Sequence, residues 1–206
     1  MYDVLRLLGS YLFLVLTAVT VENIVFARAT GLSRIITLVD NITSTYVFCS
    51  LLTVITVTSG VLYYYAYNLF TMQIERADNS TVCRVLTAIL CISVTYILVF
   101  IIAIKVMPYE HVGKAVEAMP TATFNCMVVG TILLACDKQM SLLQTVLFSL
   151  GSAAGYTLSI LYVTEGQRKL QSRDIPAAFK GLPATLLYLA GLAMAIYGLT
   201  GRIFTL

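Results

Sequence analysis

Two short stretches hold the polar residues of this chain that could do chemistry. The first is TVENIVFARATGLS, residues 20–33, which contains Glu22, Asn23 and Arg28. The second is PTATFNCMVVG, residues 120–130, where Asn125 precedes Cys126. Charges at membrane depth are functional candidates, and asparagine amides both donate and accept hydrogen bonds. Both stretches interrupt long apolar segments, and these segments must position the polar groups.

The composition is that of an integral membrane protein. Of the 206 residues, 59% are hydrophobic and 11% are charged, and the mean hydropathy is +0.90. A soluble domain would carry about a quarter charged residues. The net charge of +3 is too small to indicate a nucleic-acid partner. The chain contains no GxGxxG motif for a nicotinamide or flavin cofactor, and no residue stands out as catalytic.

The cysteines do not form a recognisable framework. There are five, an odd number, and no two form a CxxC pair. A set of disulfides is therefore disfavoured. The single histidine, His111, leaves no zinc signature. The apolar N-terminus lacks a clear small-x-small cleavage site, so we expect a retained first helix rather than a signal peptide.

The apolar segments predict an all-α membrane domain over residues 1–206. A helix needs about 20 apolar residues to cross a bilayer. Four segments meet this length easily: residues 44–70, 85–104, 139–164 and 182–201. Two are marginal, residues 7–33 and 118–136, because polar residues interrupt them. We therefore expect six transmembrane helices, of which the first and fourth are broken.

The basic residues orient the spans. Eight lie in the odd-numbered loops and five on the opposite side. By the positive-inside rule, this places the odd-numbered loops in the cytoplasm and both termini outside. The eight are Arg28, Arg34, Lys105, Lys114, Arg168, Lys169, Arg173 and Lys180, and the five are Arg6, Arg76, Arg84, Lys138 and Arg202.

The spacing of the segments indicates an internal repeat. A shift of 93 residues superposes the second span on the fifth and the third on the sixth, and Ser33 falls on Cys126. The repeats would cover residues 1–107 and 108–206. Three spans per repeat make the second repeat inverted, an arrangement that forms sites where broken helices meet. Asn23 and Asn125 would satisfy the loosened backbone of those helices.

The charges of the first stretch have two interpretations. Glu22 could lie on an ion route through the membrane. Alternatively, Glu22 lies near one membrane interface, because the uncharged run before it, residues 7–21, is only fifteen residues long. Arg28 would then snorkel to the same interface.

Three motifs resemble those of the Rnf/Nqr family of redox-driven ion pumps. VENIVFARATGLS is similar to the first-span motif and PTATFNCMVVG to the fourth-span motif. SLGSAAGYTLSILYVTEGQRKLQSRDIPAAFKG resembles the fifth span and the loop after it. The loop signature favours the A-type subunit of the Rnf complex, equivalent to the E-type subunit of the sodium-pumping NADH:quinone reductase. The resemblance covers nearly the whole chain.

The resemblance implies a [2Fe–2S] cluster between two homologous subunits of opposite orientation. Each subunit supplies two cysteines, one from each broken helix, because such a cluster takes four thiolates. Cys126 stands at the fourth-span ligand position, but Ser33 replaces the first-span cysteine. Three outcomes stay open: Ser33 is an unusual ligand, a three-cysteine site survives, or the cluster is lost. The remaining cysteines are expected to be small core residues.

The implied function is that of a membrane subunit of an ion-translocating oxidoreductase. It would support transmembrane electron transfer coupled to Na⁺ or H⁺ movement and would not be an enzyme on its own. The implied location is the bacterial cytoplasmic membrane. The expected partners are the inverted sister subunit, the other subunits of the complex and membrane lipid. The alternatives are a stand-alone transporter or a cluster-free structural paralogue on the same scaffold.

Overall fold

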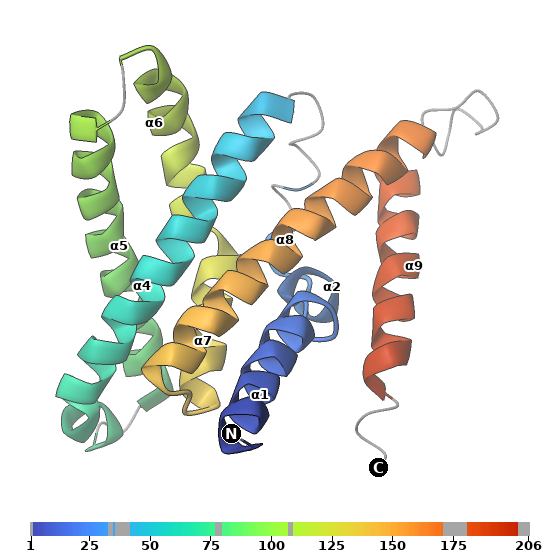
Figure 1. Cartoon of the computed structure of the whole chain (residues 1–206). Coiled ribbons are helices and arrows are strands. Elements are labelled where there is room, and N and C mark those ends of the chain that lie inside the picture. Colours follow the sequence, from blue (N-terminus) through green and yellow to red (C-terminus); the bar gives the residue numbers. More distant parts are fainter. Residues whose placement is uncertain are drawn as a thin grey trace.

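The computed structural model describes residues 2–32, 35, 42–76, 80–106, 109–170 and 181–201. Within these ranges the regular structure is entirely helical, as the composition predicts (Figure 1). The helices are α1 (Tyr2–Val19), α2 (Ile24–Arg28), α4 (Ile42–Arg76), α5 (Ser80–Val106), α6 (Tyr109–Thr123), α7 (Cys126–Asp137), α8 (Leu142–Leu170) and α9 (Leu182–Gly201).

Three of the described helices are long and apolar enough to cross a membrane. Their apolar parts are residues 45–69 of α4, 81–105 of α5 and 142–170 of α8. Helices α6 and α7 make a fourth if they are counted as one span bent by 43°. The apolar parts of α1 and α9, residues 5–19 and 182–198, are shorter. The protein is therefore a multi-pass membrane protein, and the number of six spans stays a prediction.

Helices α4 and α8 form the centre of the bundle and pack against each other. Each also packs against a helix from the other half of the chain, since α8 contacts α1 and α4 contacts α6. The start of α1 and the end of α9 lie at the same end of the bundle (Figure 1). The short α7–α8 connection also lies at this end.

A line of small residues on α8 lets α1 approach closely. A Cβ atom added at Gly151 would come within 2.9 Å of Ala18 Cβ and 3.1 Å of the Val15 carbonyl oxygen. One added at Gly155 would come within 3.0 Å of the Val19 carbonyl oxygen. Small side chains are the usual means by which helices approach one another in membranes. This contact fixes the first helix, and the turn that follows it, against α8.

Hydroxyl groups inside the bundle are mostly satisfied by their own helices. Thr56 and Ser59 of α4 each donate to a carbonyl one turn earlier, at 2.6 Å. Thr131 of α7 does the same to the Met127 carbonyl at 2.8 Å. A buried hydroxyl without a partner would be costly in an apolar medium. These residues thus add packing surface without requiring partners on other helices.

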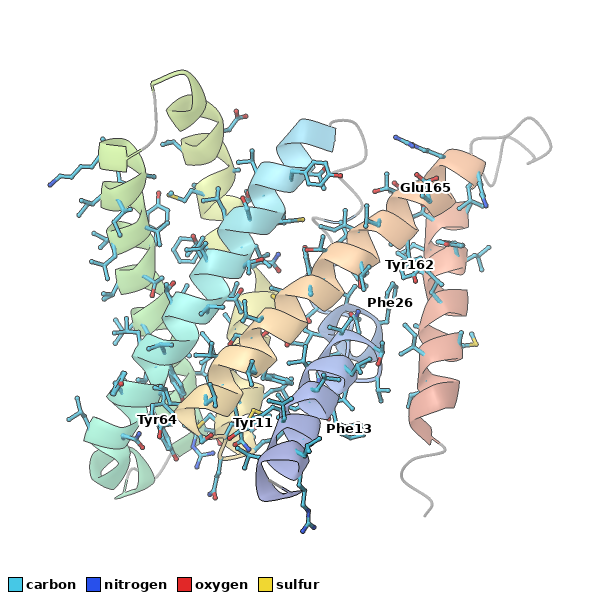
Figure 2. The ribbon with its side chains drawn as sticks, in the orientation of Figure 1. Tyr11, Phe13, Phe26, Tyr64, Tyr162 and Glu165 are labelled. Atoms are coloured by element: carbon cyan, nitrogen blue, oxygen red, sulfur yellow. The ribbon has the colours of Figure 1, made fainter. Side chains whose placement is uncertain are left out.

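The outer helices present apolar side chains outward, as a membrane protein requires. Of the apolar window of α5, 22% is buried, against 56% for α8. Phe13 of α1 is 66% exposed and Leu187 of α9 is also 66% exposed. Figure 2 shows Tyr11 and Tyr64 near one end of the bundle and Tyr162 and Glu165 towards the other. The exposed faces between these ends suit lipid chains or other membrane proteins.

We expect Gly151→Val to lower the free energy of unfolding by about 1–3 kcal/mol, because overpacking forces α1 away from α8. Thermal or denaturant unfolding of the detergent-solubilised protein measures this. The matched control is Gly191→Val in α9, where an added Cβ meets no atom within 4 Å. Equal destabilisation by the two variants would contradict close α1–α8 packing as the cause.

Candidate functional site: two capped helix breaks

The first break lies between α1 and α2, where Asn23 caps the second helix. Its side-chain oxygen accepts a hydrogen bond from the Val25 N–H at 3.1 Å. Its amide nitrogen donates to the Val19 carbonyl at 3.1 Å and to the Gly155 carbonyl of α8 at 3.0 Å. Ser159 Oγ donates to the same asparagine oxygen at 3.1 Å. One buried side chain therefore satisfies backbone groups on both sides of the break and attaches the break to α8.

The second break lies between α6 and α7, and Asn125 has the same role there. Its side-chain oxygen accepts from the Met127 N–H at 3.0 Å, and the residue is 6% exposed. The two helices meet at 43°. Pro120 lies inside α6, which continues to Thr123. The interruption is set by the asparagine cap rather than by the proline.

Tyr156 of α8 connects the two breaks. Its hydroxyl accepts a hydrogen bond from Asn125 Nδ2 at 3.0 Å and donates one to the Gly31 carbonyl at 3.1 Å. The residue is 1% exposed. Gly31 follows α2 and Asn125 precedes α7, so a single hydroxyl joins segments from both halves of the chain. Sequence reasoning missed Tyr156, which has no local feature that distinguishes it from a tyrosine of the apolar core.

Gly31 must be glycine for two reasons. Its φ of 77° lies in the left-handed region, which side chains other than glycine rarely adopt. A Cβ atom there would come within 2.7 Å of the Tyr156 ring and 2.8 Å of Asn125 Oδ1. The segment after α2 therefore packs directly against the second break. Ser33, two residues further along, lies outside the described residues.

Three threonines support the breaks locally. Thr20 Oγ1 donates to the Leu16 carbonyl at 2.8 Å, and Thr30 Oγ1 donates to the Ile24 carbonyl at 2.9 Å. Thr121 Oγ1 donates to the Ala118 carbonyl at 2.8 Å. Each hydroxyl adds a hydrogen bond to a carbonyl beside a break, and the Leu16 and Ile24 carbonyls also accept backbone N–H groups.

Cys126 is the first residue of α7 and its side chain is exposed. The neighbouring Phe124 is 59% exposed, and its ring lies 5.9 Å from that of Tyr96. All five cysteines are free, and Cys49 and Cys91 are buried. Within the described ranges, no three His, Cys, Asp or Glu side chains come together as a metal site. Cys126 is therefore a thiol presented outward from a helix N-terminus.

Glu22 forms an ion pair with Lys138, which follows α7. Lys138 Nζ also lies 5.6 Å from the centre of the Phe148 ring. The pair borders a groove of about 290 Å³ that includes Ser10, Thr17 and Gln144. Sequence analysis named Glu22 but not its partner. Arg28 lies apart, exposed in the last turn of α2.

These features define an α-helical, multi-pass membrane protein with two asparagine-capped helix breaks joined at its centre. The model of the Rnf-Nqr subunit family of membrane proteins matches residues 11–203, nearly the whole chain. The chain belongs to this family.

Two of the curated relatives match nearly the full length of the chain, and a third matches part of it. The chain is 26% identical over 196 residues to the A subunit of the ion-translocating oxidoreductase complex of Cereibacter sphaeroides, covering 94% of this chain and 98% of that protein. It is 26% identical over 196 residues to the A subunit of the proton-translocating ferredoxin:NAD(+) oxidoreductase complex of Clostridium ljungdahlii, covering 95% and 99%. The A subunit of the ion-translocating complex of Aromatoleum aromaticum is 37% identical over 87 residues, covering 42% and 45%.

We expect Tyr156→Phe to destabilise the protein by about 1–3 kcal/mol, because it leaves the buried Asn125 amide and the Gly31 carbonyl unsatisfied. The looser break should also raise the rate at which maleimide alkylates Cys126, and mass spectrometry measures this rate. Tyr162→Phe, on an exposed side of the same helix, is the control. Unchanged stability and labelling in Tyr156→Phe would show that the hydroxyl does not hold the breaks together.

Proposed function

We propose that this chain is the A-type membrane subunit of an Rnf-type ion-translocating oxidoreductase complex. In this role it supports transmembrane electron transfer coupled to Na⁺ or H⁺ movement. The names of its full-length relatives support the subunit type. The observation that carries the proposal is the meeting of the two breaks at Tyr156, with Cys126 exposed beside them.

The proposed architecture is six spans in two inverted repeats, residues 1–107 and 108–206. Its support is the paired asparagine caps, Asn23 and Asn125, each accepting from the N–H two residues later. The crosswise packing of α1 on α8 and of α6 on α4 is the pattern that a twofold relation would give. The proposed location is the bacterial cytoplasmic membrane with both termini outside, following the distribution of basic residues.

The donor groups of this chain do not fit a cluster that takes two cysteines from each of two homologous proteins. Such a [2Fe–2S] cluster needs four thiolates, and the described breaks offer only Cys126. The other expected ligand position is Ser33, whose hydroxyl is a harder and poorer ligand for iron than a thiolate. The proposed subunit therefore has an altered cluster site, and we assign no electron-transfer step to a cluster held by these residues.

We infer that a sister subunit binds at the second break. Cys126 and the exposed Phe124 lie together at the second break. The N-terminus of α7 carries a partial positive charge that favours anionic groups beside Cys126. A homologous partner with its own broken helices is the proposed occupant of this face.

Iron analysis of the complex tests the proposed site. We expect Ser33→Cys to raise the iron content and the EPR signal of the co-purified complex, because it restores the missing thiolate. Cys126→Ser in that background should abolish the gain, and Cys83→Ser, in α5 away from the breaks, is the control. The altered site would be contradicted if the wild-type complex held the full iron content of a cluster and kept it after Cys126→Ser.

The Glu22–Lys138 pair supports an ion route along the groove between α1 and α8. A carboxylate beside Ser10, Thr17 and Gln144 provides oxygen ligands for a small cation. The cation would compete with Lys138 for Glu22. The same groove would also serve a stand-alone transporter, which would move its ion without the redox partners.

We expect Glu22→Gln to lower ion uptake by vesicles containing the complex several-fold, while the subunits still assemble. Glu165→Gln is the matched control, since Glu165 pairs with Arg168 at 3.1 Å on an exposed surface. Uptake equal to that of the control would remove Glu22 from the route. Ion uptake by the chain alone, without an electron donor, would favour the stand-alone transporter.

A further inference from the structure

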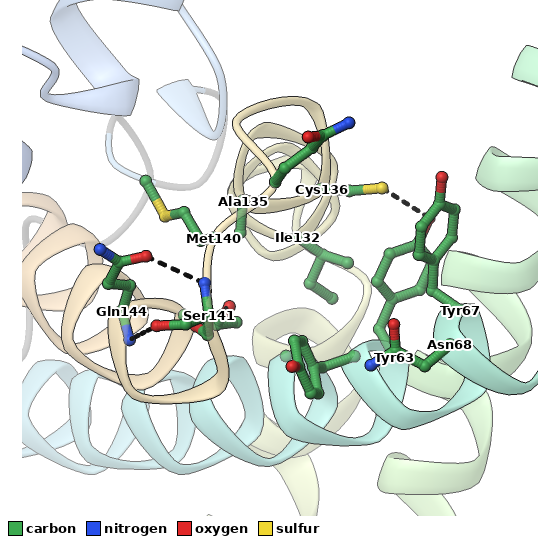
Figure 3. A pocket seen from close by; sticks show the side chains of 13 residues that line it. Tyr63, Tyr67, Asn68, Ile132, Ala135, Cys136, Met140, Ser141 and Gln144 are labelled. Carbon is green, nitrogen blue, oxygen red and sulfur yellow. Dashed lines mark hydrogen bonds between the residues drawn. The ribbon is translucent and has the colours of Figure 1, made fainter. Parts of the chain in front are cut away.

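A second cavity lies away from the helix breaks, between α4, α7 and the start of α8 (Figure 3). Its volume is about 440 Å³, which is in the range of small-molecule sites. The rings of Tyr63, Tyr64 and Tyr67 form much of its wall. No described residue that lines it is acidic or basic. The cavity itself therefore suits a neutral, partly apolar group.

The polar groups of this cavity are amides and hydroxyls. Ser141 and Gln144 cap the start of α8 reciprocally: the Ser141 N–H donates to Gln144 Oε1 at 2.9 Å, and the Gln144 N–H donates to Ser141 Oγ at 3.4 Å. This fixes both side chains at the cavity wall. Asn68 adds a second amide. Amide N–H groups donate to neutral acceptors such as ester carbonyls.

A loosely held charge pair adjoins the cavity. Arg84 Nη1 lies 3.6 Å from Asp137 Oδ1, which is too long for a hydrogen bond. The Arg84 guanidinium lies 5.9 Å from the centre of the ring of Tyr67, which lines the cavity. Asp137 directly follows Cys136, which also lines it. Arg84 Nε is buried and has no hydrogen-bond partner among the described residues. The pair therefore offers one unsatisfied donor beside one exposed carboxylate.

We propose that this cavity and the Arg84–Asp137 pair bind a phospholipid with a zwitterionic headgroup that carries a primary ammonium, of the phosphatidylethanolamine class. The phosphate accepts hydrogen bonds from Arg84, and the ammonium donates to Asp137. The glycerol ester carbonyls face the amides of Asn68 and Gln144, and the upper acyl chains pack against the tyrosine rings. Tyrosines gather at the level of the headgroups in membrane proteins, which is where this lipid region lies.

The charge pattern discriminates among lipids. An anionic headgroup satisfies Arg84 but places negative charge beside Asp137, and like charges at such separations repel. A choline headgroup has the ammonium charge but no N–H to donate. A primary ammonium headgroup alone matches both members of the pair with hydrogen bonds.

Native mass spectrometry of the delipidated full-length chain tests this with phosphatidylethanolamine, phosphatidylglycerol and phosphatidylcholine of identical acyl chains. We expect a preference of about fivefold for the ethanolamine lipid, as one partly exposed charge pair contributes up to about 1 kcal/mol. Arg84→Gln should abolish the preference. Asp137→Asn should bring phosphatidylglycerol binding up to the level of phosphatidylethanolamine.

Arg168→Gln is the matched control, because Arg168 and Glu165 form an exposed pair and neither residue lines this cavity. Equal binding of the three lipids by the wild-type chain overturns the proposal, as does an Arg84→Gln variant that behaves like Arg168→Gln. If Arg84→Gln folds poorly, Asp137→Asn serves as the test, because the Asp137 side chain is 64% exposed and its replacement should not disturb folding. Unchanged lipid selectivity in the Asp137→Asn variant also overturns the proposal.

Discussion

The structure depends on the satisfaction of backbone hydrogen bonds where two helices are interrupted. An unpaired N–H or C=O in a bilayer costs several kcal/mol, so a break persists only where the protein supplies partners. Asn23 and Asn125 supply them at the two breaks, and Gly155 and Tyr156 of α8 bind the asparagines in turn. Helix α8 is therefore the support for both breaks as well as the central packing element.

This arrangement places the exposed chemistry on a rigid base. Cys126 begins α7 immediately after a buried cap, so the position of its thiol follows from the hydrogen bonds of Asn125. Gly31 packs on the same asparagine and has no room for a side chain. Among the described residues of the two breaks, Cys126 is the one thiol, and buried hydrogen bonds hold the start of its helix in place.

Two of the described ion pairs meet near the end of α7 and have different surroundings. Glu22 and Lys138 connect the first break to the end of α7 beside a groove with hydroxyl and amide groups. Arg84 and Asp137 connect α5 to α7 beside a cavity of tyrosines. The proposed ligand of the first pair is a small cation, because hydroxyl and amide oxygens lie beside Glu22, and that of the second is a lipid headgroup, because tyrosine rings adjoin Arg84.

The sequence by itself determined the membrane class, the helical fold, the two interrupted segments and the family, because hydropathy and motifs are local properties of the chain. It also pointed to Asn23 and Asn125, since an amide in an apolar run needs hydrogen-bond partners. Only the tertiary structure decided who those partners are. Tyr156 lies 125 residues from Gly31, and Lys138 lies 116 residues from Glu22. Such contacts depend on how whole helices pack, which no local pattern encodes.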